Sequence, residues 1–562
     1  MATVLKNDVH NNVARIFYNG ILNKTSRAYF FLGKTLPWDE GDVTPPNPNA
    51  SREYERETRS SIIGLRYVSI SDVTFAIDRV DWSAGTVYDM YDDRYSSGFP
   101  APSGAQDIAD ATMFVLTTDF NIYKCISNNY NRPSTVQPTG TNETGYLEFS
   151  DGYIWKYMGT VDEVQRSKFL TPDYIPVTNS TSGFYQSGID LSLIKESGGN
   201  SYIADNVSVV IQGDAPAETV ARLGDVTIDV DTGEITGISV LDPGSGYTFA
   251  TITITNSIPG LEHPVTGLVG NGAVWRAQID QGDLVLSEVG ASAVDGQLSF
   301  IYVNDVGSGY SVDNTTVTIT GDGENASADA VIVNGEVVGI SLNNHGSGYT
   351  FANATITDTG NGTGAIAEVI ISPVGGHGKD LVKESFARTV GFQMTTADEI
   401  NQGFLLESDY RQTGLIFDPD VYLTPGAQRS RLYSSYGSTC YRLDILDASL
   451  YAGIDISSFA LDQKIYNQTT DEYLVIVAKE PYQIAEQDVG VSLLLQSIDG
   501  SEPEVGDIFQ DENNTNLFSV STDSITNPEV DKFSGSMVFI NNRTPFRKNV
   551  EQIVNLRTFI EF

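Results

Sequence analysis

The tetrapeptide Gly-Ser-Gly-Tyr occurs three times in this chain, and it constrains the fold more than any other feature. The copies are Gly244–Tyr247, Gly307–Tyr310 and Gly346–Tyr349. Each tyrosine follows another glycine by fourteen positions, and GEITGISVLDPGSGY (233–247) aligns without a gap with GEVVGISLNNHGSGY (335–349). A weaker fourth copy begins at Gly198 (GGNSYIADNVSVVI). Recurrence of one motif in such a pattern predicts a tandem array of small β units, an architecture typical of spacers and scaffolds.

The residues after each motif alternate strictly between apolar and polar. Ile252 and Ile254 are separated by threonines, and so are Val317 and Ile319. This alternation predicts half-buried strands, each entered through a glycine turn that tolerates positive φ. We expect the motif tyrosine to lay its ring over that turn. The pattern does not decide whether the units stack into one solenoid or fold separately.

Composition and turn signals predict a fold that is mainly β with minor α, in several domains, with a β-sandwich-like core. The 562 residues allow three or four domains. A helix is expected at 5–24, where Val9, Val13, Phe17 and Ile21 form a stripe with Ile16 beside it. A second is expected at Lys379–Val390, and strands at 473–479 and 491–498. The predicted division is 1–197, an N-terminal core; 198–375, the inserted array; 376–420, a helix and core-return segment; 421–530, an inserted small β domain; and 531–562, strands returning to the core.

Charge and cysteine content exclude several classes of partner. The net charge is −40, from 33 basic and 73 acidic side chains. Nucleic acid and acidic membranes are therefore poor partners, and no apolar run is long enough to span a bilayer. The charge fits solubility at high concentration or, alternatively, steering toward a basic protein surface. Cys125 and Cys440 build no disulfide framework, and the N-terminus lacks a secretory signal, which predicts synthesis in a reducing cytosol.

Signatures of catalysis and of metal binding are missing. Gly33-Lys34-Thr35 resembles the end of a phosphate-binding loop, but Ala28 stands where its first glycine is required. The DVDTGE segment (229–234) resembles the start of a calcium-binding loop, but Gly233 stands at the fifth position, where the loop requires an oxygen ligand. No Gly-x-Ser-x-Gly elbow occurs, and no carboxylate pair stands out. The histidines have no metal-ligand spacing, so loop or surface roles are expected for His10, His263, His345 and His377. We therefore expect a protein that is not an enzyme and needs no cofactor or metal.

Both ends of the chain resemble the baseplate wedge protein encoded by gene eight of T-even-type contractile-tailed phages. The GGHGKDLVKE segment (375–384) resembles the cyanophage branch of that family. The resemblance covers about half of the chain, namely residues 1–180, 376–420 and 531–562. The matching stretches, in family order, are FLGKTLPW (31–38) with the PPNP loop after it, DRVDWSAGTVYDMY (78–91), NIYKCISN (121–128), SDGYIWKYMGTV (150–161), DYRQTGLIFDP (409–419), SGSMVFINNRTPF (534–546) and EQIVNLRTFIEF (551–562).

This resemblance implies a structural virion protein of the tail baseplate, assembled in the host cytoplasm. It implies a homodimer within each of six wedges, in contact with other wedge proteins. Rearrangement of the wedges on adsorption would trigger sheath contraction. The array and the 421–530 region depart from the shorter family members, and we expect them to be outward decorations.

Residues in the matching stretches are candidates for structural or interface roles. Trp38, Trp82 and Trp155 are expected either to anchor the core or to act as hot spots for protein partners. Arg79, near Asp78 and Asp81, and Arg543, in an expected NNRTPF turn, are expected to clamp loops. Arg411 and Phe562 are the other two candidates for structural or interface roles. The apolar C-terminal segment (551–562) predicts a strand that pairs with a sheet edge, within the chain or across a dimer.

Two other functions stay open. A receptor-binding or carbohydrate-binding tail adhesin would account for the β array and for the aromatic content of 10%. A polysaccharide depolymerase has only the many carboxylates in its favour.

Overall fold

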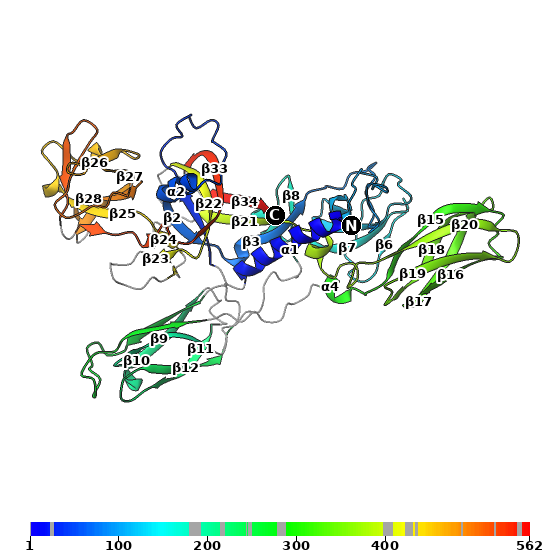
Figure 1. Cartoon of the computed structure of the whole chain (residues 1–562), viewed down its shortest axis with the longest axis horizontal. Coiled ribbons are helices and arrows are strands. Elements are labelled where there is room, and N and C mark those ends of the chain that lie inside the picture. Colours follow the sequence, from blue (N-terminus) through cyan, green and yellow to red (C-terminus); the bar gives the residue numbers. More distant parts are fainter. Residues whose placement is uncertain are drawn as a thin grey trace. The chain divides into compact units, whose positions relative to one another are not determined.

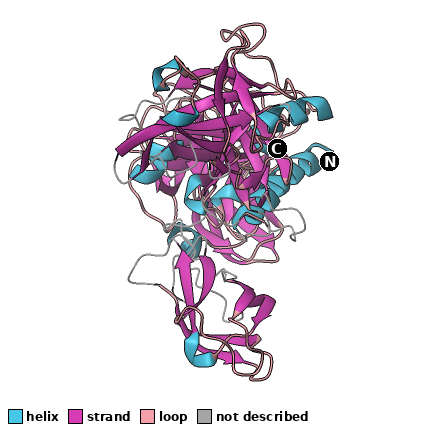
Figure 2. Cartoon of the chain, turned by 90° about the vertical axis from the view of Figure 1, so that its left-hand side faces the viewer, coloured by secondary structure: helices cyan, strands magenta, loops and turns pink. Residues whose placement is uncertain are grey.

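The computed structural model describes residues 2–22, 27–178, 193–213, 220–242, 244, 250–277, 288–396, 409–421, 431–432, 436–484, 487–498, 500–521, 524–547 and 554–562. Strands make up 49% of it and helices 11%, so the predicted mainly β, multidomain fold class is confirmed (Figure 2). Two compact units are formed by residues 1–18, 73–392 and 557–562, and by residues 19–72 and 393–556 (Figure 1).

One sheet of the second unit joins segments from both ends of the sequence. Its order is β24-β2-β1-β22-β33. The central strand is apolar and buried at every position, which fits a strand covered on both faces. Tyr29, Phe31 and Ile416 belong to its core. The strands are β1 (Ala28–Gly33), β2 (Ile62–Tyr67), β22 (Asp409–Phe417), β24 (Tyr436–Ser438) and β33 (Ser536–Arg547), and α2 (Arg52–Ser61) precedes β2.

The expected NNRTPF turn around Arg543 is wrong. These residues belong to β33, which pairs with β22 on both sides of an irregular stretch: Asn542 lies opposite Gln412 and Phe546 opposite Tyr410. The turn signal of Asn and Pro is therefore accommodated as a bulge, after which the strand continues.

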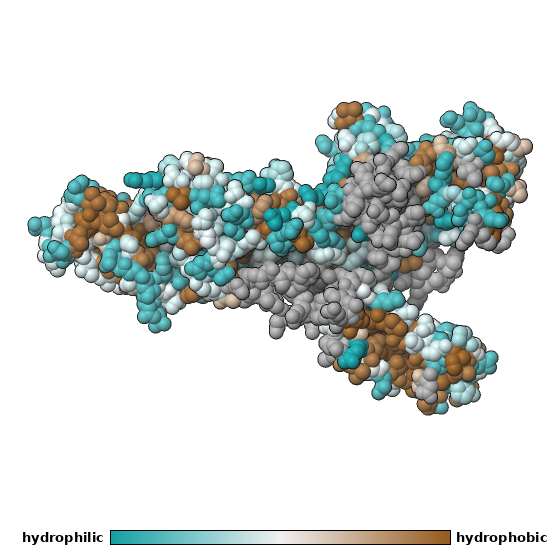
Figure 3. Space-filling model, turned by 180° about the vertical axis from the view of Figure 1, so that it is seen from behind, coloured by the Kyte–Doolittle hydropathy of each residue, from teal (hydrophilic) through white to brown (hydrophobic). Residues whose placement is uncertain are grey.

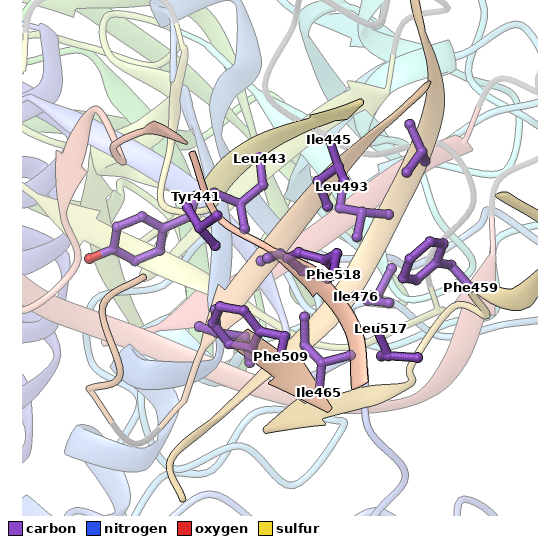
Figure 4. Close-up of a cluster of buried hydrophobic side chains, with 14 residues drawn as sticks. Tyr441, Leu443, Ile445, Phe459, Ile465, Ile476, Leu493, Phe509, Leu517 and Phe518 are labelled. Atoms are coloured by element: carbon purple, nitrogen blue, oxygen red, sulfur yellow. The ribbon is translucent and has the colours of Figure 1, made fainter. Parts of the chain in front are cut away.

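A seven-stranded sheet in residues 441–526 has a core of its own. Its order is β30-β29-β26-β27-β28-β25-β31. Phe509 stacks on Phe518 with ring centroids 5.3 Å apart, and Figure 4 shows both rings among buried aliphatic side chains. The strands predicted at 473–479 and 491–498 are confirmed. The bounds are β25 (Tyr441–Leu446), β26 (Lys464–Asn467), β27 (Tyr473–Ile484), β28 (Gln487–Ser497), β29 (Ile508–Gln510), β30 (Asn516–Ser519) and β31 (Ile525–Thr526).

Two four-stranded sheets lie outside the repeats, with orders β4-β5-β7-β6 and β34-β21-β3-β8. The second confirms that the C-terminal tail is a paired strand within the chain. The remaining bounds are β3 (Val73–Asp78), β4 (Phe114–Leu116), β5 (Asn121–Ser127), β6 (Leu147–Glu148), β7 (Ile154–Thr160), α3 (Glu163–Phe169), β8 (Tyr174–Val177), α4 (Glu288–Ser292), β21 (Thr389–Thr396), β23 (Asp420–Val421), β32 (Val530–Asp531) and β34 (Val554–Glu561).

The N-terminal helix is present, but only part of its predicted inner face is turned inward: Ile21 is 3% exposed, and the Phe17 ring lies 6.0 Å from that of Phe392. α1 spans Ala2–Leu22. Val9, Val13 and Ile16 of the apolar stripe are 55%, 44% and 72% exposed, whereas Asn11 is buried. The Asn11 amide donates to the carbonyls of Val382 (3.2 Å) and Ala387 (2.7 Å). A polar anchor therefore decides which face of the helix is turned inward.

The second predicted helix, Lys379–Val390, is also largely wrong. α5 spans only Leu381–Glu384, with Asp380 accepting from the Lys383 N–H as N-cap. Phe386 follows at φ 52°, and Thr389 already pairs with Ala76 of β3 in β21. The β-branched residues Thr389 and Val390 join the sheet instead of continuing the helical stripe.

The repeat region forms two separate six-stranded modules, each with internal pairing. In both, the first strand pairs with the sixth, the second with the fifth and the third with the fourth. The predicted start at 198 falls inside β9. The first module contains β9 (Ile194–Asn200), β10 (Val207–Gly213), β11 (Arg222–Ile228), β12 (Ile235–Asp242), β13 (Ala250–Asn256) and β14 (Asn271–Arg276); the second contains β15 (Leu298–Ser308), β16 (Thr315–Gly321), β17 (Glu324–Val333), β18 (Glu336–Ser347), β19 (Ala352–Asp358) and β20 (Thr363–Ile371).

The expected alternation and tyrosine turn are both found. Ile252 and Ile254 pack on one apolar cluster of the first module, and Val317 and Ile319 on that of the second. Tyr310 and Tyr349 are each 6% exposed. A Cβ added at Gly362 would lie 2.4 Å from Cδ1 of Tyr310. The ring is thus pressed onto a glycine backbone. Most of the first copy, Ser245–Tyr247, lies outside the described residues.

The motif also locks the two repeats of a module together. The Tyr310 N–H donates to the Gly335 carbonyl at 3.0 Å, and the Tyr349 N–H donates to the Gly296 carbonyl at 3.1 Å. Gly296 and Gly335 are the glycines that precede the motif tyrosines by fourteen residues. In the weak fourth copy, the Tyr202 N–H donates to the Gly233 carbonyl, and Ser201, at φ 62°, has the positive φ that the second motif glycines Gly309 (81°) and Gly348 (74°) supply in the second module. The two copies of the second module therefore make a reciprocal pair.

Candidate functional site

Trp38, Arg411 and Arg543 meet in a buried polar clamp beside the five-stranded sheet. The Arg411 guanidinium binds the Asp42 carboxylate in a bidentate manner, with Nε–Oδ1 at 2.7 Å and Nη2–Oδ2 at 2.8 Å. It also donates to the carbonyl of Thr35. The Trp38 indole N–H donates to the Arg543 carbonyl at 3.3 Å. This geometry fixes the 35–42 loop onto β22 and β33, as charge-assisted and indole hydrogen bonds do.

A cavity of about 260 Å³ lies next to this clamp. The Lys34 ammonium lies 5.2 Å from the ring centroid of Trp38, and Lys34 has a φ of 58°. Burial lowers the pKa of Lys34, although Asp39 and Glu57 oppose that effect. Residues lining the cavity include Lys34, Trp38, Tyr54, Glu57, Gln412 and Gln496. Its polar groups are mostly paired with one another: Gln412 donates to Tyr54 at 3.3 Å, for example.

Arg79, Asp81 and Trp82 form a second group, which holds a loop beside β4. Arg79 Nε lies 2.8 Å from Asp81 Oδ1, and Arg79 Nη1 donates to the Thr171 carbonyl at 2.9 Å. The Trp82 indole donates to Ser134 Oγ at 3.1 Å. These contacts match the expected loop-clamping geometry, with Asp81 as the acid that Arg79 binds.

Trp155 and Phe562 serve cores rather than surfaces. Trp155 has no exposed area; its ring stacks on Tyr153 (centroids 5.5 Å apart) and meets Tyr88 edge-on. The Phe562 N–H donates to the Arg388 carbonyl at 3.0 Å, and its ring lies 4.7 Å from that of Phe17 in α1. The last residue of the chain is therefore fixed to the first helix.

The most unusual cluster of charges was missed by the sequence analysis. Lys124 of β5 and Glu384 of α5 form an ion pair of 2.7 Å, with side chains 0% and 4% exposed. His377 Nδ1 lies 3.7 Å from the same carboxylate. His377 and His263 lie in loops, as one of the two expected roles has it, but neither is a surface residue, because they are only 3% and 4% exposed. A lysine inside the apolar strand NIYKCIS was the one local signal that could have pointed here.

The protonation states in this cluster follow from burial and from the ion pair. Burial lowers the pKa of Lys124, which Glu384 partly offsets. Burial alone would raise the pKa of Glu384, but Lys124 brings it below its usual value. Burial and the nearby Lys124 lower the pKa of His377 to about 3. The imidazole is therefore neutral at physiological pH, beside a charged pair.

The described residues offer little other reactive chemistry. Burial raises the pKa of the Cys125 thiol well above its usual value and that of Cys440 to about 12, so neither is an activated nucleophile. No group of three or more His, Cys, Asp or Glu side chains within the described ranges could hold a metal ion. None of the helices in the same ranges is long and apolar enough to cross a membrane.

The chain matches no protein-family model, and a search of curated proteins finds no significant match.

Proposed function

We propose that this chain is a structural virion protein, a wedge subunit of a contractile phage tail baseplate. The observation that carries the proposal is the convergence of three sequence stretches that resemble the wedge family. The FLGKTLPW, DYRQTGLIFDP and SGSMVFINNRTPF stretches contribute β1, β22 and β33 to one sheet. Their most distinctive side chains, Trp38 and Arg411, are used to fix backbone.

Such use of Trp and Arg favours a scaffold over a catalyst. A catalytic site needs groups held ready for a substrate, whereas these groups already satisfy one another. The two modules have apolar clusters of their own, and so has the 441–526 sheet. This arrangement is the one expected when self-contained units are inserted into a parent fold.

The proposed partners are other wedge proteins and a second copy of this chain, with six wedges in a baseplate. The net charge of −40 favours neighbours with basic surfaces. Apolar residues also gather on the surface of the first module (Figure 3). The same module exposes Val230, Leu241 and Val265, at 77%, 71% and 65%. Exposed apolar groups of this kind favour contact with another protein.

The test is a nonsense mutation of the gene in the phage that encodes the chain, with a complementing host as control. A wedge subunit predicts filled heads without complete contractile tails, and the chain in purified wild-type virions by mass spectrometry. Light scattering of the purified protein should give twice the chain mass of 61.0 kDa. Complete virions that assemble without the protein but fail to adsorb would instead support the tail adhesin.

A further inference from the structure

We propose that the side chains of Lys124 and Glu384 condense to an intramolecular amide bond, which ties the chain together below the inserted modules. This inference rests on the geometry of the cluster and is independent of the proposed virion role. The ion pair described above is its starting state.

The two reacting groups are held in contact and are shielded from solvent. Lys124 Nζ lies 2.7 Å from Glu384 Oε2, and the side chains are 0% and 4% exposed. The ammonium also lies 4.3 Å from the ring centroid of Tyr91 and 5.7 Å from that of Phe114. Contact between reactants in a fixed orientation replaces most of the entropy that an intermolecular condensation loses.

The carboxylate is held like the carbonyl of an acyl-transfer site. Glu384 Oε1 accepts from the backbone N–H groups of Gly378 (2.7 Å) and Asp380 (3.3 Å). Two such donors stabilise negative charge on that oxygen in a tetrahedral intermediate. Gly378 has a φ of 91°, and a Cβ there would lie 2.6 Å from Val289 Cγ1, so the site requires glycine.

His377 lies where a proton relay is needed. Its Nε2 is 2.8 Å from Ser299 Oγ, and its Nδ1 is 3.7 Å from Glu384 Oε2. Nδ1 makes no hydrogen bond with any described residue. The ring is held by Tyr91, edge-on at 4.8 Å. Nζ can pass its first proton directly to Oε2 along their 2.7 Å hydrogen bond, and the imidazole beside Oε2 can carry the second proton to the same oxygen.

The step balances without any further reagent. The ammonium gives a proton to Oε2 along their hydrogen bond, and the Nζ lone pair then forms a bond with Cδ of Glu384. Charge collects on Oε1, between the two backbone donors. The Cδ–Oε2 bond then breaks, and Oε2 leaves as water with the two protons that Nζ has lost. A neutral amide replaces two buried charges, whose desolvation is unfavourable.

The position of the bond gives it a mechanical consequence. Lys124 and Glu384 are 260 positions apart, and both repeat modules lie between them in the sequence. A covalent link there would close the segment that carries the modules into a loop. A pull on either module could then be transmitted no further than Lys124 and Glu384, so strands outside the loop, such as β4, would not be loaded.

The test is the intact mass of the denatured full-length chain. The wild type should be lighter than its sequence mass by one water molecule, and tandem mass spectrometry should find the peptides of Lys124 and Glu384 joined. Lys124→Arg keeps a cation in the pocket but cannot form this amide, so that variant should have its full calculated mass.

Lys156→Met is the matched control. Lys156 is also buried, but it donates to the carbonyls of Glu143 (2.6 Å) and Gly145 (3.2 Å) and not to a carboxylate. This variant should keep the loss of water, and His377→Gln should acquire it more slowly. A wild-type chain at its full sequence mass overturns the proposal, and so does a water loss that persists in Lys124→Arg. Neither readout depends on the variants being stable, because the wild-type mass alone can refute the bond.

Discussion

At the scale of single residues, the aromatic anchors make the clearest prediction. Trp155 is fully buried and its indole nitrogen has no hydrogen-bond partner among the described residues. Trp155→Ala should therefore lower the free energy of unfolding by about 3–5 kcal/mol, the usual cost of emptying such a site. Trp155→Phe keeps the stack on Tyr153 and loses no hydrogen bond, so it should cost clearly less. Urea unfolding followed by near-ultraviolet circular dichroism compares the two, and equal losses would contradict the packing argument.

The buried histidine predicts a dependence of stability on pH. The pKa of His377 is about 3 in the folded chain against 6.5 for a free histidine. Between these values the unfolded chain binds a proton that the folded chain excludes, so stability must fall as pH decreases from 6.5 towards 3. The melting temperature of the wild type should drop more between about pH 7 and pH 5 than that of His377→Gln, because only the former titrates there. If the melting temperatures of the wild type and of His377→Gln fell by the same amount over this pH range, the imidazole would have to be protonated in the folded chain as well.

The contacts of single residues also show which roles can be predicted from the neighbouring sequence and which cannot. The roles of Trp38 and Arg79 as anchor and clamp could be predicted, because their types restrict what they do when half-buried. The pairing of Lys124 with Glu384 could not, because the partners are 260 positions apart and nothing in either neighbourhood refers to the other. The orientation of α1 was predicted only in part for the same reason: the partners of Asn11 lie in the 382–387 segment.

At the scale of elements, the outer face of α1 predicts where the proposed homodimer is joined. Val9, Val13 and Ile16 lie on that face and are exposed in the single chain. Burying such a side chain contributes roughly 1.5–3 kcal/mol, and an aspartate there would leave a charge without a partner. Ile16→Asp should therefore convert a dimer into a monomer by light scattering. Val312→Asp, at an equally exposed site on the second module, is the control and should stay dimeric. Dimers in both variants would place the interface elsewhere.

The glycine–tyrosine turns give a prediction for the second module. Gly362→Ala would place a methyl group 2.4 Å from the Tyr310 ring, which is held in the module core. The module should open and become sensitive to limited proteolysis. Gly237→Ala is the matched change in the first module, because its Cβ would meet Thr227 at an ordinary 3.5 Å. Resistance of Gly362→Ala to protease would mean that the ring can move aside.

Strands were easier to predict than helices in this chain, for a physical reason. The Thr-Ile alternation in 251–255 and the motif glycines are short-range signals that act within one strand and its turn. The apolar pattern of Lys379–Val390 was just as regular, but its last residues, Thr389 and Val390, pair with β3 and form a strand. Sequence alternation also left open how the repeats combine, since reciprocal bonds such as Tyr310 to Gly335 join one repeat to another.

At the scale of the whole molecule, the first module should be removable. Its ends are adjacent, because Ile194 of β9 is paired with Arg276 of β14. Its strands pair only with one another, and its two apolar clusters are built from residues 193–277. Excision of 193–277 with a short Gly-Ser linker should leave the rest of the chain folded, with an unchanged oligomeric state. The excised segment should fold alone, because it carries its own core.

The second module is the internal comparison for that experiment. It also has paired ends, Leu298 opposite Ile371, but Tyr130 packs against its Phe300 (5.8 Å) and Tyr302 (5.7 Å). Excision of 298–371 should therefore lower the melting temperature of the remainder, whereas excision of 193–277 should not. Differential scanning calorimetry of both shortened chains separates the cases. An insoluble product after loss of the first module would show that it is part of the parent fold, and the reading of both modules as insertions would then be wrong.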